Sequence, residues 1–330
     1  MDARYSRLFW QKQVVADLAI SCHLSPGSDS GYDPRHSSIK SFRGQAMLIL
    51  PVMLGVFLLP VASVDAETDA EFDVRERIVY SKVADRELLL DAFVPKDDGP
   101  HPAVLVVHGG AWKSGDRKQL RGYANALATR GFVCFAIDYR LAPKDKFPAQ
   151  IEDCREAVKW IRANSAEYNV DPNKLGAIGY SAGGHLVCLL ATTGEAPSQK
   201  NGNVDTRIQA VAAGGAPTDF RKFPDDGKWA AYWMGGDLKT QPDRFRDASA
   251  TAFVDKDDAP VFFFNGTEDE LVSVEWSKSC HDALRTCGVR TEMYTIAGAG
   301  HLTAAMNPAA LEKAYSFLQK ELQIDASTAE

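Results

Sequence analysis

The fold of this protein is decided by the stretch 177-AIGYSAGGHLVCLL-190. An apolar run typical of a buried strand ends in front of a single serine, and an apolar run typical of a helix follows at once. Glycine suits so tight a strand-to-helix turn, and that alone could explain the composition. The spacing Gly179-x-Ser181-x-Gly183 is also that of a nucleophile elbow, which presents a serine for chemistry.

Strand and helix patterns alternate on both sides of this turn. Near-continuous apolar strands between helices indicate a parallel sheet that is buried on both faces. We therefore predict an α/β fold, doubly wound, with a mostly parallel sheet and helices on both faces. Strands are predicted at 103–110, 132–140, 175–180, 207–215, 260–266 and 290–298, after an opening hairpin at 74–83 and 88–95, and helices at 118–130, 148–166, 182–193, 273–286 and 308–322.

One segment between two predicted strands breaks this alternation. Residues 217–250 contain Trp229, Tyr232 and Trp233 among many charges, without a clear period. An insertion at this point of an α/β sheet predicts a short cap over the ligand side, and a plain surface excursion is the alternative. We call residues 217–250 the cap insertion.

The beginning of the chain has the pattern of a targeting segment. The apolar run 46-AMLILPVMLGVFLLPVASVDA-66 follows basic residues and closes with a small-x-small sequence, which is typical of a secretory signal peptide. We therefore expect a secreted or periplasmic protein, with an uncleaved membrane anchor as the alternative. Residues 1–45 are expected to be disordered or to lie upstream of the true start, and residues 67–330 to form a single domain.

Composition excludes several classes of function. The 330 residues are 45% hydrophobic, which supplies an ample core, and the net charge is -7 without a clustered basic stripe. A nucleic-acid partner is therefore not expected. The cysteines and histidines show no spacing typical of a metal site, so we expect no metal. A stable membrane partner is expected only if the segment 46–66 remains uncleaved.

Polar residues that follow strand ends supply the partners that Ser181 would need. Ligands of parallel sheets bind outside the carboxyl ends of the strands. Of the seven histidines, only His301 follows a predicted strand in a glycine-lined loop, where it could take the serine proton. Asp269 follows the 261–266 strand and could orient His301, with Glu268 in reserve and a solvated acidic loop as the alternative. The chain order Ser181, Asp269, His301 is that of α/β-hydrolases.

Backbone N–H groups are predicted to stabilise the oxyanion. Glycine lets the backbone approach a substrate closely, which points to Gly109 and Gly110 in 108-HGGAW-112. The N–H of Ala182, at the start of the predicted helix, would add a donor. A simple tight turn is the alternative for the glycine pair. We call residues 108–112 the oxyanion loop.

Aromatic residues are candidates for substrate binding. Trp112 is expected to pack against the site or to line its wall. Trp229 and Trp233 could line an acyl or alcohol pocket or form the core of the cap insertion, and Tyr180 lies next to the serine. His185 follows Ser181 on the same predicted helix and is interpreted as a packing residue.

Four motifs together resemble those of hormone-sensitive-lipase-like esterases in the α/β-hydrolase superfamily, most closely the feruloyl/acetyl-xylan esterase-like branch. The resemblance spans roughly residues 75–322 and implies a serine carboxylester hydrolase without a cofactor. It places the nucleophile, acid and base on Ser181, Asp269 and His301, and the oxyanion hole on the three residues already named. The motifs are 108-HGGAW-112, 138-DYRLAP-143, 179-GYSAGGH-185 and 266-GTEDELV-272.

The sequence departs from this family at two positions. Asn265 stands where the family often has histidine, and Ala111 stands where many relatives have a third glycine of the oxyanion loop. The first change should spare the triad, and the second makes bulky tertiary-alcohol esters less suitable substrates. Within 138-DYRLAP-143, Asp138 and Arg140 are interpreted as a structural ion pair or a loop brace.

The expected function is hydrolysis of small acyl esters through an acyl-enzyme, with small-molecule or carbohydrate-linked acetyl or feruloyl esters as substrates. One alternative is an amidase, arylformamidase or peptidase that uses the same three residues. Another is a non-catalytic binding module on this fold.

Overall fold

One mixed sheet forms the centre of the fold in the computed structural model, which describes residues 71–195, 204–222 and 224–323. The strands are β1 (Phe72–Val83), β2 (Arg86–Pro95), β3 (His101–Val107), β4 (Val133–Ile137), β5 (Val170–Tyr180), β6 (Ala210–Gly214), β7 (Val261–Gly266) and β8 (Thr291–Ile296). The α-helices are α2 (Arg121–Ala128), α3 (Ala149–Ala163), α4 (Ala182–Thr193), α5 (Ala231–Met234), α6 (Pro242–Asp247), α7 (Val274–Thr286), α8 (His301–Ala305) and α9 (Pro308–Glu321). Short 3-10 helices are η1 (Phe220–Lys222), η2 (Pro224–Ala230) and η3 (Ala250–Ala252).

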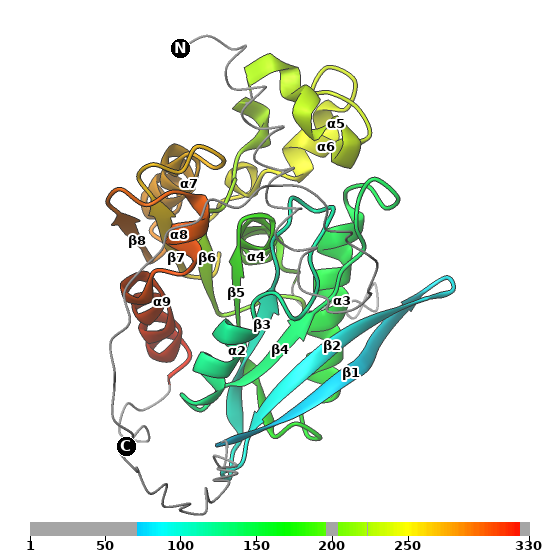
Figure 1. The fold of residues 1–330 in the computed structure, drawn as a ribbon, viewed down its shortest axis with the longest axis vertical. Helices are drawn as coiled ribbons and strands as arrows, with labels where there is room; N and C mark the ends of the chain where they lie inside the picture. Colours follow the sequence, from blue (N-terminus) through cyan, green and yellow to red (C-terminus); the bar gives the residue numbers. More distant parts are fainter. Residues whose placement is uncertain (1–70, 196–203, 223, 324–330) are drawn as a thin grey trace, which may run out of the picture. The chain divides into compact units, whose positions relative to one another are not determined.

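The strand order of the sheet is β1-β2-β4-β3-β5-β6-β7-β8. The β1–β2 hairpin is antiparallel and β2 also pairs antiparallel with β4, whereas every pairing from β4 through β8 is parallel. Parallel neighbours require crossovers, and the helices between the strands provide them. The carboxyl ends of β3, β5, β6, β7 and β8 therefore meet at one edge of the sheet (Figure 1).

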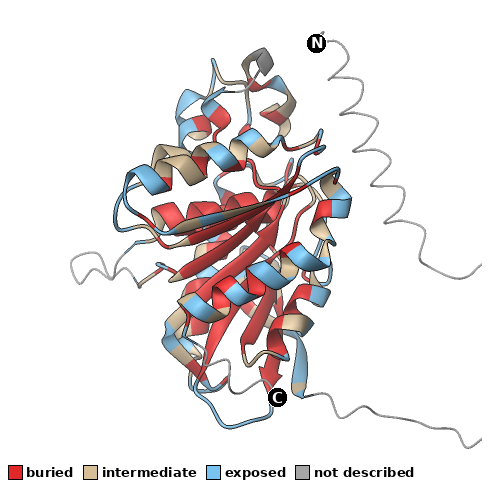
Figure 2. Cartoon of the chain, turned by 90° about the vertical axis from the view of Figure 1, so that its left-hand side faces the viewer, coloured by how far each residue is buried: buried red, intermediate tan, exposed pale blue. Residues whose placement is uncertain are grey.

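Helices cover both faces of this sheet, so the central strands β3, β4, β6 and β7 are buried throughout (Figure 2). Along β3 the side chains alternate between two apolar clusters, with Leu105 in one and Val106 in the other. The first cluster includes residues of α3, α4 and α7, and the second includes residues of α2 and α9. This two-sided burial explains why the central strands, such as β3, are apolar throughout rather than alternating.

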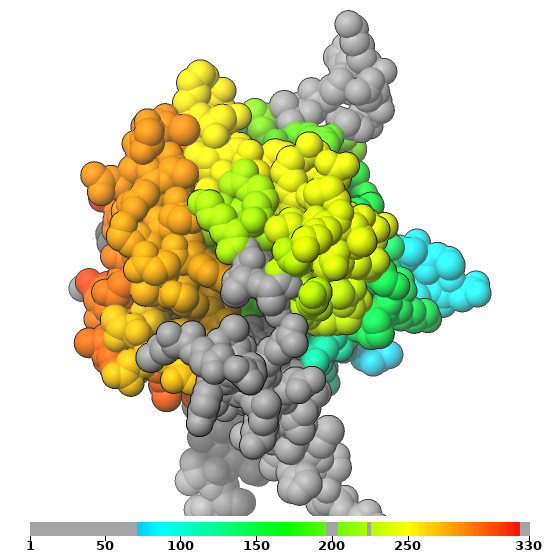
Figure 3. Space-filling view, turned by 90° about the horizontal axis from the view of Figure 1, so that it is seen from above, coloured from blue at the N-terminus to red at the C-terminus, as the bar shows by residue number. Residues whose placement is uncertain are grey.

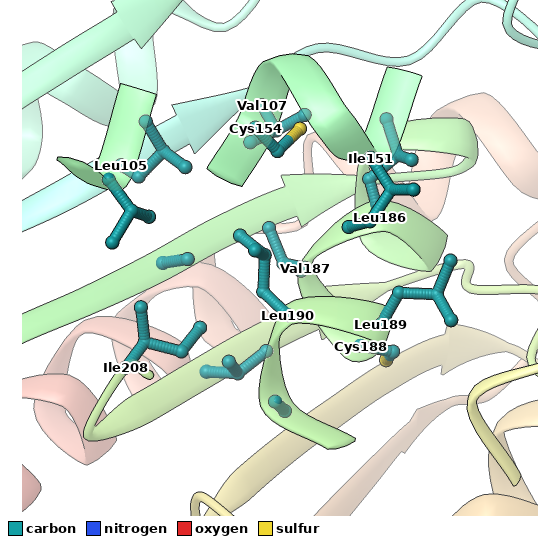
Figure 4. Packing of buried hydrophobic residues seen from close by; sticks show 14 of the residues in the cluster. Leu105, Val107, Ile151, Cys154, Leu186, Val187, Cys188, Leu189, Leu190 and Ile208 are labelled. Carbon is teal, nitrogen blue, oxygen red and sulfur yellow. The ribbon is translucent and has the colours of Figure 1, made fainter. Parts of the chain in front are cut away.

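The packing of α3 and α4 against the sheet is close and almost entirely aliphatic (Figure 4). Leu186, Val187 and Leu190 of α4 are fully buried beside Leu105 of β3 and Cys154 of α3. Each fully buried aliphatic side chain contributes roughly 1.5–3 kcal/mol relative to exposure to water. Helix α4 is thus fixed firmly, and so is the turn that precedes it.

The cap insertion lies between β6 and β7 and contains η1, η2, α5 and α6 (Figure 1). Seen from above, its yellow-green to yellow residues lie between the orange residues that follow β7 and green residues of the segment leading to α3 (Figure 3). Hydrogen bonds join it to both neighbours. The Phe147 N–H donates to the Trp233 carbonyl at 3.0 Å, and Thr218 Oγ1 donates to the Trp276 carbonyl at 2.6 Å.

The predicted fold class is confirmed by this architecture. The described residues all belong to one compact unit, Asp69–Glu330. The predictions for residues 1–45 and for the signal-like segment 46–66 lie outside the described residues. Among the helices of the described chain, none combines the length and apolar character needed to cross a membrane.

Candidate active site

Ser181 sits at a backbone corner between β5 and α4 that only small neighbours permit. Its φ is 57°, in the left-handed region that L-residues rarely adopt. A Cβ on Gly183 would lie 2.0 Å from the Val107 carbonyl oxygen, and a Cβ on Gly179 would lie 2.5 Å from the Gly183 carbonyl. The Ser181 N–H donates to the Gly214 carbonyl at 2.8 Å, which ties the corner to β6. Glycine at these two positions is therefore a steric requirement of the turn.

Asp269 and His301 are joined directly. His301 Nδ1 lies 2.7 Å from Asp269 Oδ2, and the side chains are 10% and 0% exposed. The other carboxylate oxygen, Oδ1, accepts the N–H groups of Leu271 at 3.0 Å and Val272 at 2.8 Å. Both oxygens of Asp269 are thus engaged, whereas the reserve candidate Glu268 is exposed. The pair leaves Nε2 of His301 available for a proton.

Strand β6 brings the His301 ring beside the serine corner. A Cβ on Gly215 would lie 3.1 Å from His301 Cε1, and Gly215 directly follows the residue that accepts the Ser181 N–H. Tyr180, the neighbour of Ser181, donates its hydroxyl to the His301 carbonyl at 2.6 Å. Within the described chain the Ser181 hydroxyl makes no hydrogen bond. Such bonds are often long before substrate binds, so the hydroxyl remains free to engage His301.

The oxyanion loop lies against the serine corner, but Gly109 is a correction to the prediction. A Cβ on Gly109 would be 3.4 Å from Ser181 Cβ. Its N–H, however, donates to Gln119 Oε1 at 2.8 Å, so it is not available to a substrate while this bond exists. In the described part of the chain, the N–H groups of Gly110 and Ala111 have no acceptor. Ala182, at the start of α4, adds the N–H of a helix N-terminus.

Gln119 could not be predicted from the sequence, because an isolated exposed glutamine carries no recognisable signal.

Behind the loop, the Tyr139 hydroxyl contacts the carbonyls of His108 at 3.0 Å and Gly109 at 3.2 Å. The His108 ring stacks on Tyr139 with centroids 4.1 Å apart. Burial lowers the pKa of His108 to about 4, so at neutral pH it is an uncharged packing residue. The loop is therefore braced from the sheet side.

Trp112 and Trp233 are buried, which favours the packing alternative for both over the lining of a substrate pocket. Their rings stack with centroids 3.8 Å apart and an interplanar angle of 1°, and their exposed fractions are 3% and 0%. Trp112 Nε1 donates to His185 Nδ1 at 3.1 Å, and His185 Nε2 lies 2.7 Å from the Ala248 carbonyl. The interpretation of His185 as a packing residue is confirmed by these contacts and its complete burial.

Tyr180 also differs from its predicted role. Its side chain is buried, and its hydroxyl supports the backbone of His301, so it offers little surface to a substrate. Burial raises the pKa of Tyr180, which keeps the hydroxyl a donor. Trp229 is half-buried and packs beside Trp112 at 6.5 Å between ring centroids. Its role as a substrate contact stays a prediction.

Asp138 and Arg140 brace loops, but they do so with other partners and not as a pair. Asp138 Oδ2 lies 3.0 Å from Arg117 Nη1, and Arg117 Nε lies 2.7 Å from buried Asp91. Arg140 Nη2 lies 2.7 Å from Asp153, at the start of α3. The pairs of Arg117 fix the chain after the oxyanion loop to β2 and to the residue after β4, and the pair of Arg140 fixes the chain after β4 to α3.

A recess elsewhere in the described residues is separate from the serine corner. This recess of about 500 Å³ between α3, α4 and α6 includes neither Ser181 nor the Asp269–His301 pair. Across residues 71–195, 204–222 and 224–323, no group of three or more histidine, cysteine or acidic side chains could hold a metal ion.

The fold and the serine corner place this chain among known proteins. Residues 90–284, more than half of the chain, match the family model BD-FAE. The chain belongs to the BD-FAE family. This family match confirms the predicted resemblance to α/β-hydrolase esterases.

Among curated proteins, this BD-FAE chain is similar to esterase LipC of Mycobacterium tuberculosis. The two are 33% identical over 241 residues, which is 69% of this chain and 59% of LipC. Across LipC, LipM and LipQ of the same bacterium, the chain spans 59%, 48% and 52% of their lengths. The chain thus spans about half of the length of the curated relatives it matches.

Solved structures show the same fold. A thermophilic esterase of Thermogutta terrifontis, Est2, is 26% identical with a TM-score of 0.66, covering 79% of this chain and 95% of Est2. Further structures of Est2 contain propionate or butyrate. A carbohydrate esterase from gut microbiota has a TM-score of 0.69, covering 78% of this chain and 99% of that one, and at 23% identity it shows the fold alone.

Proposed function

We propose that this protein is a carboxylic ester hydrolase that acts on small acyl esters through a serine acyl-enzyme. The observation that carries the proposal is the His301–Asp269 bond of 2.7 Å beside the strained corner of Ser181. A buried carboxylate on one imidazole nitrogen fixes the ring and stabilises its charged form when the other nitrogen takes a proton. Membership of the BD-FAE family supports the same activity.

The proposed reaction follows from these positions. Ser181 Oγ attacks the ester carbonyl while His301 Nε2 takes its proton, and the ring then donates that proton to the leaving alcohol. Water hydrolyses the acyl-enzyme by the same relay. The negative oxygen of each tetrahedral intermediate is stabilised by the N–H groups of Gly110, Ala111 and Ala182, at about 3–4 kcal/mol for each well-placed donor.

The substrate proposal is a short acyl group on a small or carbohydrate alcohol. Est2 structures with propionate or butyrate support a short acyl group in a related esterase. The carbohydrate alcohol rests on the motif resemblance to feruloyl and acetyl-xylan esterases. Export through the segment 46–66 remains part of this proposal, because polymeric carbohydrate esters are extracellular substrates.

The test compares wild-type protein with Ser181→Ala on p-nitrophenyl acetate, propionate and butyrate, on acetylated xylan, and on formyl-kynurenine as an amide. Turnover of the esters should be lost in Ser181→Ala, together with labelling by a fluorophosphonate. The control is Ser165→Ala, which replaces a serine between α3 and β5, at the opposite edge of the sheet. Full activity in Ser181→Ala would refute the proposal, and preference for the amide would redirect it to an amidase.

A further inference from the structure

The oxyanion loop has a backbone that needs outside support. Gly110, Ala111 and Trp112 follow one another with φ values of 100°, 51° and 58°. Glycine tolerates this region, but each of the two L-residues there costs roughly 1–2 kcal/mol. Such a conformation persists only when surrounding contacts over-determine it. The question is which contacts hold the peptides whose N–H groups face the serine corner.

Contacts from outside the cap insertion hold the oxyanion loop at several points. Gln119 accepts the Gly109 N–H, and the Tyr139 hydroxyl contacts the carbonyls of His108 and Gly109. Further along, the Gly110 carbonyl accepts the N–H groups of Lys113 and Ser114, and the Trp112 carbonyl accepts the Ala142 N–H at 2.8 Å. None of these contacts reaches the Ala111 carbonyl, in the middle of the strained stretch, so this carbonyl must be held from elsewhere.

The cap insertion supplies that support. The Tyr232 hydroxyl, on α5, donates to the Ala111 carbonyl at 2.5 Å, across 121 residues of sequence. The next residue of α5, Trp233, stacks on Trp112. The Ala248 carbonyl, directly after α6, contacts the far nitrogen of the same His185 ring that accepts from Trp112. Among these contacts, only the one from Tyr232 is made to the loop backbone in the strained stretch.

We propose that Tyr232 is a positioning residue for catalysis, whose hydroxyl fixes the Ala111–Trp112 peptide and so holds the neighbouring N–H groups of Gly110 and Ala111 in place. The inference rests on the proposed ester hydrolase function. The cap insertion would then position the donors of the oxyanion hole. Burial raises the pKa of Tyr232, so the hydroxyl stays a donor throughout the range in which the enzyme would work.

The variant Tyr232→Phe removes only this hydroxyl. Deleting a whole oxyanion donor lowers kcat by about 10²–10³-fold, so misplacing donors should lower it by about 10-fold or more. The KM of p-nitrophenyl acetate should stay within about twofold, because the lost interaction acts in the transition state. The inhibition constant of phenylboronic acid, whose tetrahedral adduct mimics the oxyanion, should rise in parallel with the fall in kcat.

The control is Tyr80→Phe, because the Tyr80 hydroxyl also donates to a backbone carbonyl, that of Asp138, at 2.6 Å. Active protein in each preparation is titrated with a fluorophosphonate, so that a loss of folded enzyme is not counted as a loss of kcat. The inference is overturned if Tyr232→Phe matches Tyr80→Phe in kcat and boronate affinity, or if KM alone changes. The proposed function fails by a different result: the wild-type protein turns over no ester, or Ser181→Ala remains active.

Discussion

Ser181 and Asp269 of the proposed triad are shaped mainly by backbone that is close in sequence, whereas the oxyanion loop is held by side chains that lie up to 121 residues away. Asp269 accepts N–H groups two and three residues ahead, and Ser181 is shaped by glycines two residues away on either side. Ala111 instead depends on Tyr232, 121 residues later. Local motifs therefore describe Ser181 and Asp269 well and the oxyanion hole poorly.

The largest expected effect tests the triad half of this comparison. Asp269→Asn should keep the bonds of Oδ1 to the N–H groups of Leu271 and Val272, so its amide NH₂ would face His301 Nδ1. That nitrogen would then have to accept, and the ring proton would move to Nε2, where it blocks transfer from Ser181. The kcat for p-nitrophenyl acetate should fall on the order of 10⁴-fold.

The companion variant Glu268→Gln changes the exposed neighbouring acid and should leave kcat at the wild-type level. If kcat fell in Glu268→Gln and not in Asp269→Asn, Glu268 would be the acid that orients His301, and the assignment of Asp269 would be wrong. Steady-state kinetics on the two purified variants decides between these outcomes.

The next effect tests whether the cap insertion and the oxyanion loop form one unit. Trp233→Ala removes a fully buried ring that stacks on Trp112 and donates to Gln150 Oε1 at 3.0 Å. The free energy of unfolding, measured with urea, should fall by about 3–5 kcal/mol. The kcat of the folded fraction should fall too, because Trp112 loses its partner.

Phe93→Ala is the matched control, since Phe93 on β2 is also buried but does not touch the cap insertion. It should lose comparable stability and keep its kcat when measured below its unfolding transition. Equal losses of kcat in both variants would show that stability alone accounts for the effect, which would break the comparison between the two regions.

The smallest effect sharpens the same comparison through pH. Burial lowers the pKa of His185 to about 3, against about 6.5 in an unfolded chain. Below pH 6.5 the unfolded state therefore binds a proton that the folded state does not bind, and the free energy of unfolding falls as the pH falls. For one such histidine the slope approaches about 1.4 kcal/mol per pH unit.

Urea unfolding between pH 7 and pH 4 measures this slope, and His185→Gln should reduce it while keeping a polar group between Trp112 and Ala248. Burial also lowers the pKa of His108, to about 4. His108 should therefore contribute a similar slope, and this contribution should persist in His185→Gln. An unchanged slope in His185→Gln would contradict the burial of this ring as a neutral link to the cap insertion.

Much of the fold could be predicted because its information is repeated along the chain. Strands buried on both faces are apolar at every position, so β3, β4 and β7 are visible without knowledge of their neighbours. The positions of Ser181, Asp269 and His301 at strand ends follow from the same alternation. Gly109 could not be assigned correctly, and the two tryptophans could not be assigned to packing or to a pocket, because their roles depend on partners such as Gln119 and His185.

The sequence by itself determined the parallel sheet, the glycine-lined serine corner and the acid and histidine that follow later strands, because each depends on residue types at short spacing. Only the tertiary structure decided which N–H groups remain free beside Ser181 and which aromatic rings are buried. The physical reason is that an N–H group already bonded within the chain, or a ring face already packed against another ring, cannot also contact a substrate. Whether it meets a substrate or another part of the chain is settled when residues between 10 and 121 positions apart come together.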